Sequence, residues 1–134
     1  MIYSKYTHCS NCGHKYDILE WPRICGACDA YVFSNPKPVA VILQPVTDGN
    51  RTGLVVAKRA IDPCAGEWSL ISGYMDHGDD DIFATAVREF KEETGLDLKQ
   101  PLAICHNVNN HHGSVLTFVK TSEVMYYDEF LTHT

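Results

Sequence analysis

Residues 73–96 read GYMDHGDDDIFATAVREFKEETGL, and this stretch decides the fold. Glu89, Glu92 and Glu93 stand at i, i+3 and i+4, so on a helix their carboxylates lie within one turn. Like charges at this spacing repel each other by about 0.2–0.5 kcal/mol per pair. A divalent cation held between the carboxylates would turn that repulsion into attraction. The spacing therefore predicts a metal site.

The same stretch predicts a helix that begins at Asp80 or Asp81 and ends at Thr94. An aspartate is a favoured N-cap, and Gly95 is a typical helix stop. The apolar stripe of this helix consists of Phe83, Ala86, Val87 and Phe90, and we expect it to be buried. The three glutamates are displaced from the stripe, so they face a cleft or water.

Length and composition allow one core of ordinary size with a small appendage. The chain has 134 residues, 45% of them hydrophobic, and a formal net charge of -6. Residues 1–35 are neutral overall, so the excess acid lies in residues 36–134, which makes the chain a poor nonspecific nucleic-acid binder. The sequence contains no apolar run of membrane-spanning length. We expect a cytoplasmic protein with no membrane partner.

Four of the six cysteines have the spacing of metal ligands. Cys9 and Cys12 form one C-x-x-C pair, Cys25 and Cys28 form a second, and twelve residues separate the pairs. Four thiolates suit a structural zinc ion, and two disulfides or a redox-active pair are the alternatives. The remaining two, Cys64 and Cys105, are expected to be free thiols in or near the core.

Prolines after the second cysteine pair mark a boundary near Asn35. The predicted domains are a zinc ribbon at residues 1–34 and an α+β domain at residues 35–134. Residues 39–46 and 52–58 are predicted to form a hairpin, and further strands are expected at 68–72, 98–105 and 114–120, with a polar loop at 106–113. The residues after 120 are compatible with a strand, a short helix or a tail.

Residues 73–96 resemble the Nudix box. The second half of the box is matched at every specified position, by Arg88, Glu89, Phe90, Glu92, Glu93, Gly95 and Leu96. In the first half, Asp79 or Asp80 takes the place of the family's glutamate, and one extra residue lies between the loop and the helix. The resemblance implies a Nudix-like α/β/α sandwich with a mixed sheet.

The N-terminal cysteines, followed by Asn35-Pro36-Lys37-Pro38-Val39, resemble the zinc ribbon that precedes some Nudix domains. Members with this extension include proteins similar to NADH pyrophosphatase and to ADP-ribose or FAD pyrophosphatases. A Nudix domain usually continues through a further strand and a second helix. The C-terminus at Thr134 is therefore expected to be short, and a homodimer partner would supply the missing wall.

The resemblance implies a metal-dependent pyrophosphohydrolase that cleaves a nucleoside diphosphate linked to another moiety. Magnesium or manganese would be bound by Glu89, Glu92 and Glu93 and by the Gly73 carbonyl. Arg88 would orient the carboxylates, with Asp79 or Asp80 as its partner in the loop. The base is expected to be one of the same glutamates or an acid outside the box, for which the candidates are Glu123, Asp128 and Glu129.

The substrate class implied by the ribbon is a dinucleotide or nucleotide sugar such as NADH, ADP-ribose or FAD. Arg59, at a predicted strand end, and Tyr74, next to the loop glycine, are the candidate substrate contacts. Trp68 and the histidines of residues 106–113 are alternatives that have ordinary structural interpretations. Because residues 36–134 are acidic and offer no broad basic track for long RNA, the ends of capped RNA are the nucleic-acid substrate that is still considered.

A second hypothesis keeps the fold but not the reaction. A Nudix module can bind a nucleotide as a sensor while its zinc ribbon contacts a partner, and the departures from the box are compatible with this. A third hypothesis, a zinc-ribbon adaptor for nucleic acid, requires basic residues on the ribbon. The neutral charge of residues 1–35 argues against it.

Overall fold

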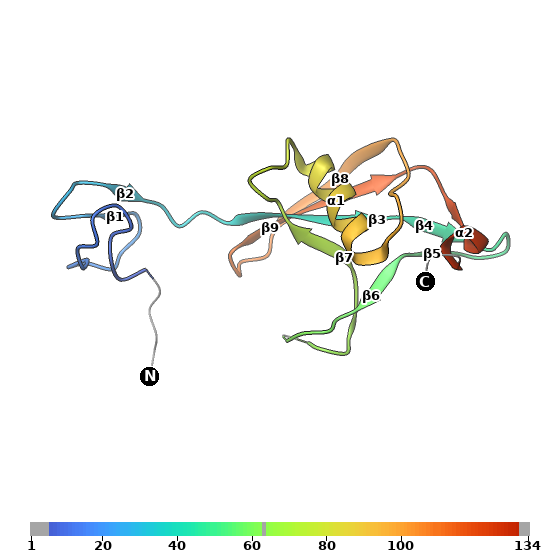
Figure 1. The fold of residues 1–134 in the computed structure, drawn as a ribbon, viewed down its shortest axis with the longest axis horizontal. Coiled ribbons are helices and arrows are strands. Elements are labelled where there is room, and N and C mark those ends of the chain that lie inside the picture. The colour runs from blue at the N-terminus through green and yellow to red at the C-terminus, as the bar shows by residue number, and fades with distance from the viewer. Residues whose placement is uncertain (1–5, 63, 132–134) are drawn as a thin grey trace. The chain divides into compact units, whose positions relative to one another are not determined.

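The computed structural model describes residues 6–62 and 64–131 and divides the chain into two compact units, residues 1–35 and 36–134 (Figure 1). Among the described residues, no helix is long and apolar enough to cross a membrane. The described part of the chain is mixed α and β, which confirms the predicted α+β class.

The N-terminal unit is built from two similar turns, each closed around a cysteine pair. Gly13 N–H donates to the Cys9 carbonyl at 2.8 Å, and Asp29 N–H donates to the Cys25 carbonyl at 2.9 Å. Gly13 and Asp29 both have positive φ, at 82° and 61°, because each turn needs a left-handed residue four positions after its first cysteine. A short antiparallel pair, β1 (Arg23–Ile24) and β2 (Tyr31–Val32), follows the first turn and brackets the second.

The C-terminal unit is organised on a mixed five-stranded sheet in the order β6-β7-β3-β9-β8. Its central strand β3 (Lys37–Leu43) runs parallel to β9 (Ser114–Thr121) and antiparallel to β7 (Trp68–Tyr74). The edges are β6 (Val56–Lys58) and β8 (Leu102–Asn109). A smaller sheet has the order β10-β4-β5 and consists of β10 (Met125–Tyr126), β4 (Pro45–Thr47) and β5 (Thr52–Leu54).

The predicted hairpin of residues 39–46 and 52–58 is only partly correct. Each arm is split, at Gln44 and at Val55, so that β5 pairs with β4 while β6 pairs with β7. Gln44 is fully buried, and its side-chain amide bonds the carbonyls of Pro45 and Glu123 and accepts from Lys99 N–H. A buried amide satisfied by distant backbone groups fixes the corner between the two sheets.

The strand predicted at residues 98–105 and the loop predicted at 106–113 are both shifted. Strand β8 covers residues 102–109, and only the short turn before β9 remains. Leu98 does not belong to a strand but packs into the core, which explains its apolar character. His106 lies in β8 with its ring 5.7 Å from that of Phe118, so this histidine is part of the sheet rather than of a loop.

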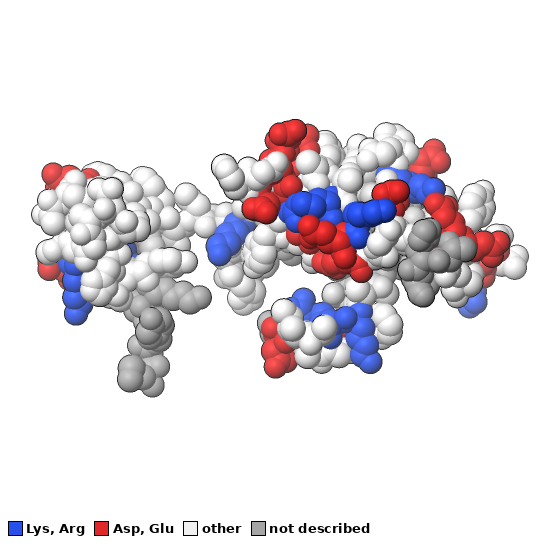
Figure 2. All heavy atoms as spheres, viewed as in Figure 1, with Lys and Arg blue, Asp and Glu red and all other residues white. Residues whose placement is uncertain are grey.

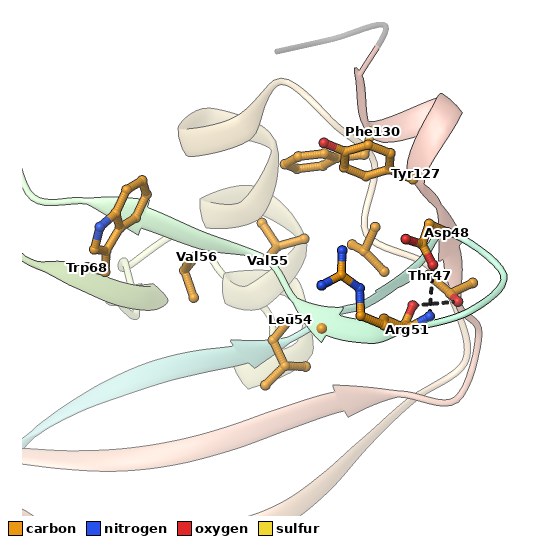
Figure 3. Close-up of a pocket in the computed structure, with 11 residues that line it drawn as sticks. Thr47, Asp48, Arg51, Leu54, Val55, Val56, Trp68, Tyr127 and Phe130 are labelled. Carbon is orange, nitrogen blue, oxygen red and sulfur yellow. Dashed lines mark hydrogen bonds between the residues drawn. The ribbon is translucent and has the colours of Figure 1, made fainter.

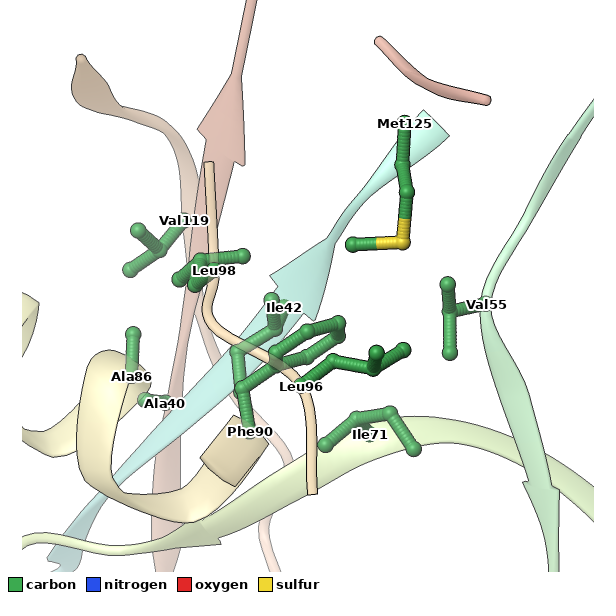
Figure 4. Packing of buried hydrophobic residues seen from close by; sticks show 10 residues of the cluster. All are labelled: Ala40, Ile42, Val55, Ile71, Ala86, Phe90, Leu96, Leu98, Val119 and Met125. Atoms are coloured by element: carbon green, nitrogen blue, oxygen red, sulfur yellow. The ribbon is translucent and has the colours of Figure 1, made fainter. Parts of the chain in front are cut away.

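Helix α1 (Ile82–Thr94) agrees with the prediction at both ends. Asp81 is the N-cap and accepts from Ala84 N–H at 2.8 Å, and Gly95 ends the helix in the left-handed conformation. The helix packs on β7, β3 and β9. Its buried apolar side chains, Ala86 and Phe90, enter the hydrophobic core cluster. Figure 4 shows the ten buried members of this cluster: Ala40, Ile42, Val55, Ile71, Ala86, Phe90, Leu96, Leu98, Val119 and Met125.

Three expectations about burial are wrong. Val87 is 37% exposed, and Thr85 is fully buried instead, so the helix turns a polar residue inward next to the loop that precedes it. Cys64 and Cys105 are both exposed rather than close to the core. Cys64 lies in the loop between β6 and β7, and Cys105 lies on the edge strand β8.

Residues 125–131 form two short elements, a strand and a helix, and residues 132–134 lie outside the described part of the chain. Strand β10 pairs in parallel with β4, and it leads directly into α2 (Tyr127–Leu131). Met125 is fully buried in the core, which anchors this segment. The five-residue helix α2 contacts β10 and β4.

Candidate functional site

Gly73 and Glu89 lie in direct contact where β7 meets α1. A Cβ at position 73 would stand 2.1 Å from the Glu89 Cδ and 2.3 Å from its Oε2, which no side chain permits. Glycine is therefore required here for the approach of a carboxylate rather than for an unusual φ. The predicted proximity of the loop glycine to the helix glutamates is present in the structure.

Arg88 ties the loop before the helix to the helix itself. Its Nε and Nη2 donate to the two carboxylate oxygens of Asp79 at 3.0 and 2.8 Å, and Nη2 also donates to the Tyr74 carbonyl at 3.1 Å. Nη1 donates to Glu89 at 2.9 Å and lies 3.3 Å from a Glu92 oxygen. From the sequence, either Asp79 or Asp80 could be the partner of Arg88, and in the structure Asp79 accepts the paired hydrogen bonds of the Arg88 guanidinium, here called the Arg88 fork.

Asp79 is itself held by two further donors. The Thr85 hydroxyl donates to its Oδ2 at 2.9 Å, and so does Asp76 N–H at 2.9 Å. The hydrogen bonds from Arg88 lead the causes that hold the pKa of Asp79 well below its usual range, so its carboxyl stays ionised. Sequence reasoning missed Thr85, although a polar residue three positions before Arg88 within the apolar stripe was a signal.

The three glutamates form a crowded acidic group beside Arg88. Burial leads the causes that raise the pKa of Glu93, followed by repulsion from Glu89 and Glu92. Figure 2 shows acidic side chains in red next to basic ones in blue over the region of α1. The three carboxylates therefore lie close enough to repel one another. They are less tightly gathered than the cysteines: among the described residues, the group of three or more potential metal ligands whose ligand atoms all lie within 4.8 Å of one another is Cys9, Cys12, Cys25 and Cys28.

Two hollows adjoin this acidic group, and they share Arg59 and Ser72. One has a volume of about 360 Å³ and is lined by Lys58, Arg59 and Glu93 among others. The other has a volume of about 560 Å³ and includes Gly73 and Tyr74. Both predicted substrate contacts therefore border hollows beside the acidic group, Arg59 in both and Tyr74 in one.

The candidate bases outside the box lie elsewhere. Glu129 forms an ion pair with Lys99 at 2.7 Å, and Glu123 accepts from Gln44 through its backbone carbonyl. Asp128 borders a small hollow at the β4–β5 turn. None of the three lines either of the two hollows beside α1.

The four paired cysteines converge on one point in the N-terminal unit. The Sγ atoms of Cys9 and Cys28 lie 3.6 Å apart, as do those of Cys12 and Cys25, and all four are within 4.8 Å. Tetrahedral zinc with bonds of about 2.3 Å requires sulfur–sulfur distances of about 3.8 Å. The donor set fits zinc.

A family model described as NUDIX domain matches residues 36–130. The chain belongs to the NUDIX domain family. The match covers most of the C-terminal unit, including the Gly73–Glu89 contact and the Arg88 fork. Comparison with curated proteins finds no significant match.

Solved Nudix structures share this fold. A Nudix hydrolase from Nitrosomonas europaea is 25% identical, with a TM-score of 0.65 over 88% of this chain and 69% of its own. The NUDIX domain of Shewanella oneidensis NrtR, solved with ADP ribose, is 18% identical, with a TM-score of 0.62 over 71% of this chain and 64% of that one. A MutT/nudix family protein from Enterococcus faecalis is 17% identical, with a TM-score of 0.58 over 67% and 39%.

The three structural similarities support different conclusions. The two structures below 25% identity show the fold alone, and this chain spans between 39% and 69% of the length of the three neighbours. The coverage by the Nitrosomonas structure exceeds the share of residues 36–134, so that similarity includes part of the N-terminal unit. The family match and the hydrolase neighbour support a hydrolase that acts on diphosphate bonds.

Proposed function

We propose that the protein is a metal-dependent pyrophosphohydrolase that cleaves a nucleoside diphosphate linked to another moiety. The observation that carries this proposal is the Glu89 carboxylate lying against Gly73, held there by Arg88 and beside Glu92 and Glu93. Burial of Glu93 and repulsion from Glu89 and Glu92 together raise the pKa of Glu93, so part of the cost of this acidic group is the repulsion among its carboxylates. Binding of a divalent cation removes that repulsion.

The donor set fits magnesium or manganese because every candidate ligand is an oxygen. In the proposal the ligands are Glu89, Glu92, Glu93 and the Gly73 carbonyl. Gly73 has no Cβ, which leaves its backbone accessible next to the Glu89 carboxylate. When bound, the metal supplies charge neutralisation for the diphosphate and lowers the pKa of the attacking water.

The side chains of the protein perform the remaining tasks. Arg88 orients the Glu89 and Glu92 carboxylates, and Asp79 fixes Arg88. A glutamate of the acidic group accepts the proton of the attacking water. Arg59 borders the hollow that contains Glu93 and the hollow that contains Gly73, which supports a role for its guanidinium in contacting a phosphate that spans them.

The substrate class is NADH, ADP-ribose or FAD. The larger hollow has an apolar floor from Val39 and Leu116, with Tyr74 beside Gly73, which suits a planar group attached to the diphosphate. ADP-ribose is included because the NrtR domain of the same fold was solved with it, a property that belongs to that protein.

The N-terminal unit is proposed to be a zinc ribbon, with Cys9, Cys12, Cys25 and Cys28 as ligands. Its buried cluster contains two of the cysteines, Cys9 and Cys25, and one large side chain, Tyr16, in addition to small groups. So small a core needs the metal for most of its folding free energy.

The experiment is an assay of nucleoside monophosphate release. The protein is incubated with NADH, ADP-ribose, FAD and a nucleoside triphosphate, each with magnesium, with manganese or with EDTA. We expect cleavage of at least one dinucleotide or nucleotide sugar with metal and none with EDTA. A nucleotide that binds without being cleaved under either metal would refute the hydrolase and support the sensor hypothesis instead.

A further inference from the structure

A hollow of about 510 Å³ lies on the edge formed by β5 and β6, beneath the short helix α2. Its size is within the range of small-molecule sites, which are mostly apolar with a few placed polar groups. Figure 3 shows its walls: Leu54, Val55 and Val56 along the edge, the Tyr127 and Phe130 rings above, and Arg51 between them. No residue of α1 or of the loop before it contributes to the lining.

Arg51 points its guanidinium into this hollow from a rigid turn (Figure 3). Its N–H donates to Asp48 Oδ1 at 2.8 Å, and its carbonyl accepts from the Thr47 hydroxyl at 2.9 Å and from Asp48 N–H at 3.2 Å. These bonds fix the backbone of the turn, so the direction in which the side chain leaves is determined.

Asp48 also lines the hollow, but its carboxylate is bound by the backbone of the turn and forms no ion pair with the Arg51 guanidinium. Asp48 Oδ1 accepts from the backbone N–H groups of Asn50 and Arg51, and these hydrogen bonds lower the pKa of Asp48. No ion pair or hydrogen bond joins the Arg51 guanidinium to any other side chain within residues 6–62 and 64–131. An unpaired guanidinium next to apolar walls is suited to an anionic group.

The aromatic walls suit a planar group. The Tyr127 and Phe130 rings lie stacked with centroids 6.2 Å apart, and Phe130 also packs against the core, which fixes the pair. Tyr127 is 46% exposed, and Trp68 is 68% exposed at the other end of the hollow. Large aromatic side chains this exposed, gathered around one cavity, are typical of a surface that a ligand covers.

This hollow is separate from the proposed reaction site. Trp68 is the first residue of β7 and Gly73 is its sixth, which at the rise of a strand places them roughly 17 Å apart. Arg59, which borders both hollows beside α1, does not line this one.

We propose that the hollow around Arg51, Tyr127 and Trp68 is a second binding site for a planar aromatic ligand that carries an anionic group. The ring stacks on the aromatic walls and the anion pairs with Arg51. The choice of probe rests on the proposed function, because nucleoside monophosphates are products of that reaction and belong to this ligand class. Binding at this site does not require catalysis.

The test is a titration of the zinc-loaded protein with adenosine 5′-monophosphate, with no magnesium or manganese added and no chelator present, followed by tryptophan fluorescence. Without magnesium or manganese the acidic group beside α1 does not attract a phosphate. We expect a saturable change that is lost in Trp68→Phe, since Trp68 lines the site, and an affinity at least tenfold weaker in Arg51→Gln. Adenosine should bind the original protein at least tenfold more weakly than the monophosphate.

Matched variants identify the site. Arg59→Gln changes an arginine of the other hollows and should leave the affinity within twofold, and Arg51 and Trp68 are exposed, so their variants should fold with unchanged Tm. Equal affinity for adenosine and its monophosphate, equal affinity in Arg51→Gln, or no saturable signal overturns the proposal. If the original protein binds adenosine 5′-monophosphate here but cleaves none of the substrates in the monophosphate-release assay, the proposed function is contradicted and this second site is still supported.

Discussion

Gly73→Ala is the most informative single substitution, because the structure gives the size of the perturbation. The added Cβ would stand 2.1 Å from the Glu89 Cδ, whereas ordinary contacts begin at 3.4 Å, so the carboxylate must move by at least 1.3 Å. A misplacement of about 1 Å in a reacting constellation costs roughly 10²-fold in rate. The Glu89 carboxylate is the far end of a side chain, so the fold can accommodate the change.

We expect Gly73→Ala to lower kcat by roughly 10²-fold while its Tm stays close to that of the original protein. The assay is metal-dependent release of nucleoside monophosphate, with melting followed by circular dichroism. Gly78→Ala is the matched control, since Gly78 lies in the loop that follows β7, meets nothing within 4 Å and has no positive φ. Full activity in Gly73→Ala would refute the reasoning that Glu89 must lie against this glycine.

Three further predictions concern the supports of the site. Thr85→Val removes a buried hydroxyl that donates to Asp79, and it should lower kcat about tenfold at unchanged KM, whereas Thr85→Ser should keep the original kcat. Equal kcat values in the two variants would contradict a positioning role for this hydroxyl. Asp79→Asn should lower Tm at neutral pH, because a carboxyl whose pKa is lowered in the folded state stabilises the fold above its unfolded pKa of about 4. The difference in Tm between the variant and the original protein should shrink as the pH falls below that value, and a difference that stays constant with pH would argue against the ion pair. Cys25→Ser should lose the single bound zinc ion, measured as metal content, and the folded N-terminal unit, measured by hydrogen exchange, whereas the control Cys105→Ser should keep both. Zinc that is retained in Cys25→Ser would exclude the four-cysteine site.

What could be predicted from the sequence was mainly local. The ends of α1 follow from Asp81 and Gly95, and the spacing of the glutamates places their carboxylates together once the helix exists. The cysteine pairs are also local, because each turn closes over five residues. Such features require only short-range geometry, and the structure reproduces them.

What the sequence did not predict depends on distant partners. The break at Gln44 arises because its amide is bonded near residues 99 and 123, and no pattern along residues 39–46 indicates those contacts. The shift of β8 has a similar cause: Leu98 is apolar because it packs into the core, not because it alternates in a strand. Thr85 was overlooked because the partner that explains its burial, Asp79, belongs to the loop.

The acidic group on α1 is the centre of the proposed mechanism, so its substitution tests the account most directly. The measurement is metal-dependent turnover of the substrate found in the panel by Glu92→Gln and Glu93→Gln, each a near-isosteric change that removes one charge. The account predicts that both variants lose at least 10²-fold in kcat while keeping their Tm, since the change also relieves repulsion within the group. Turnover that survives both substitutions would contradict the assignment of the metal to these carboxylates.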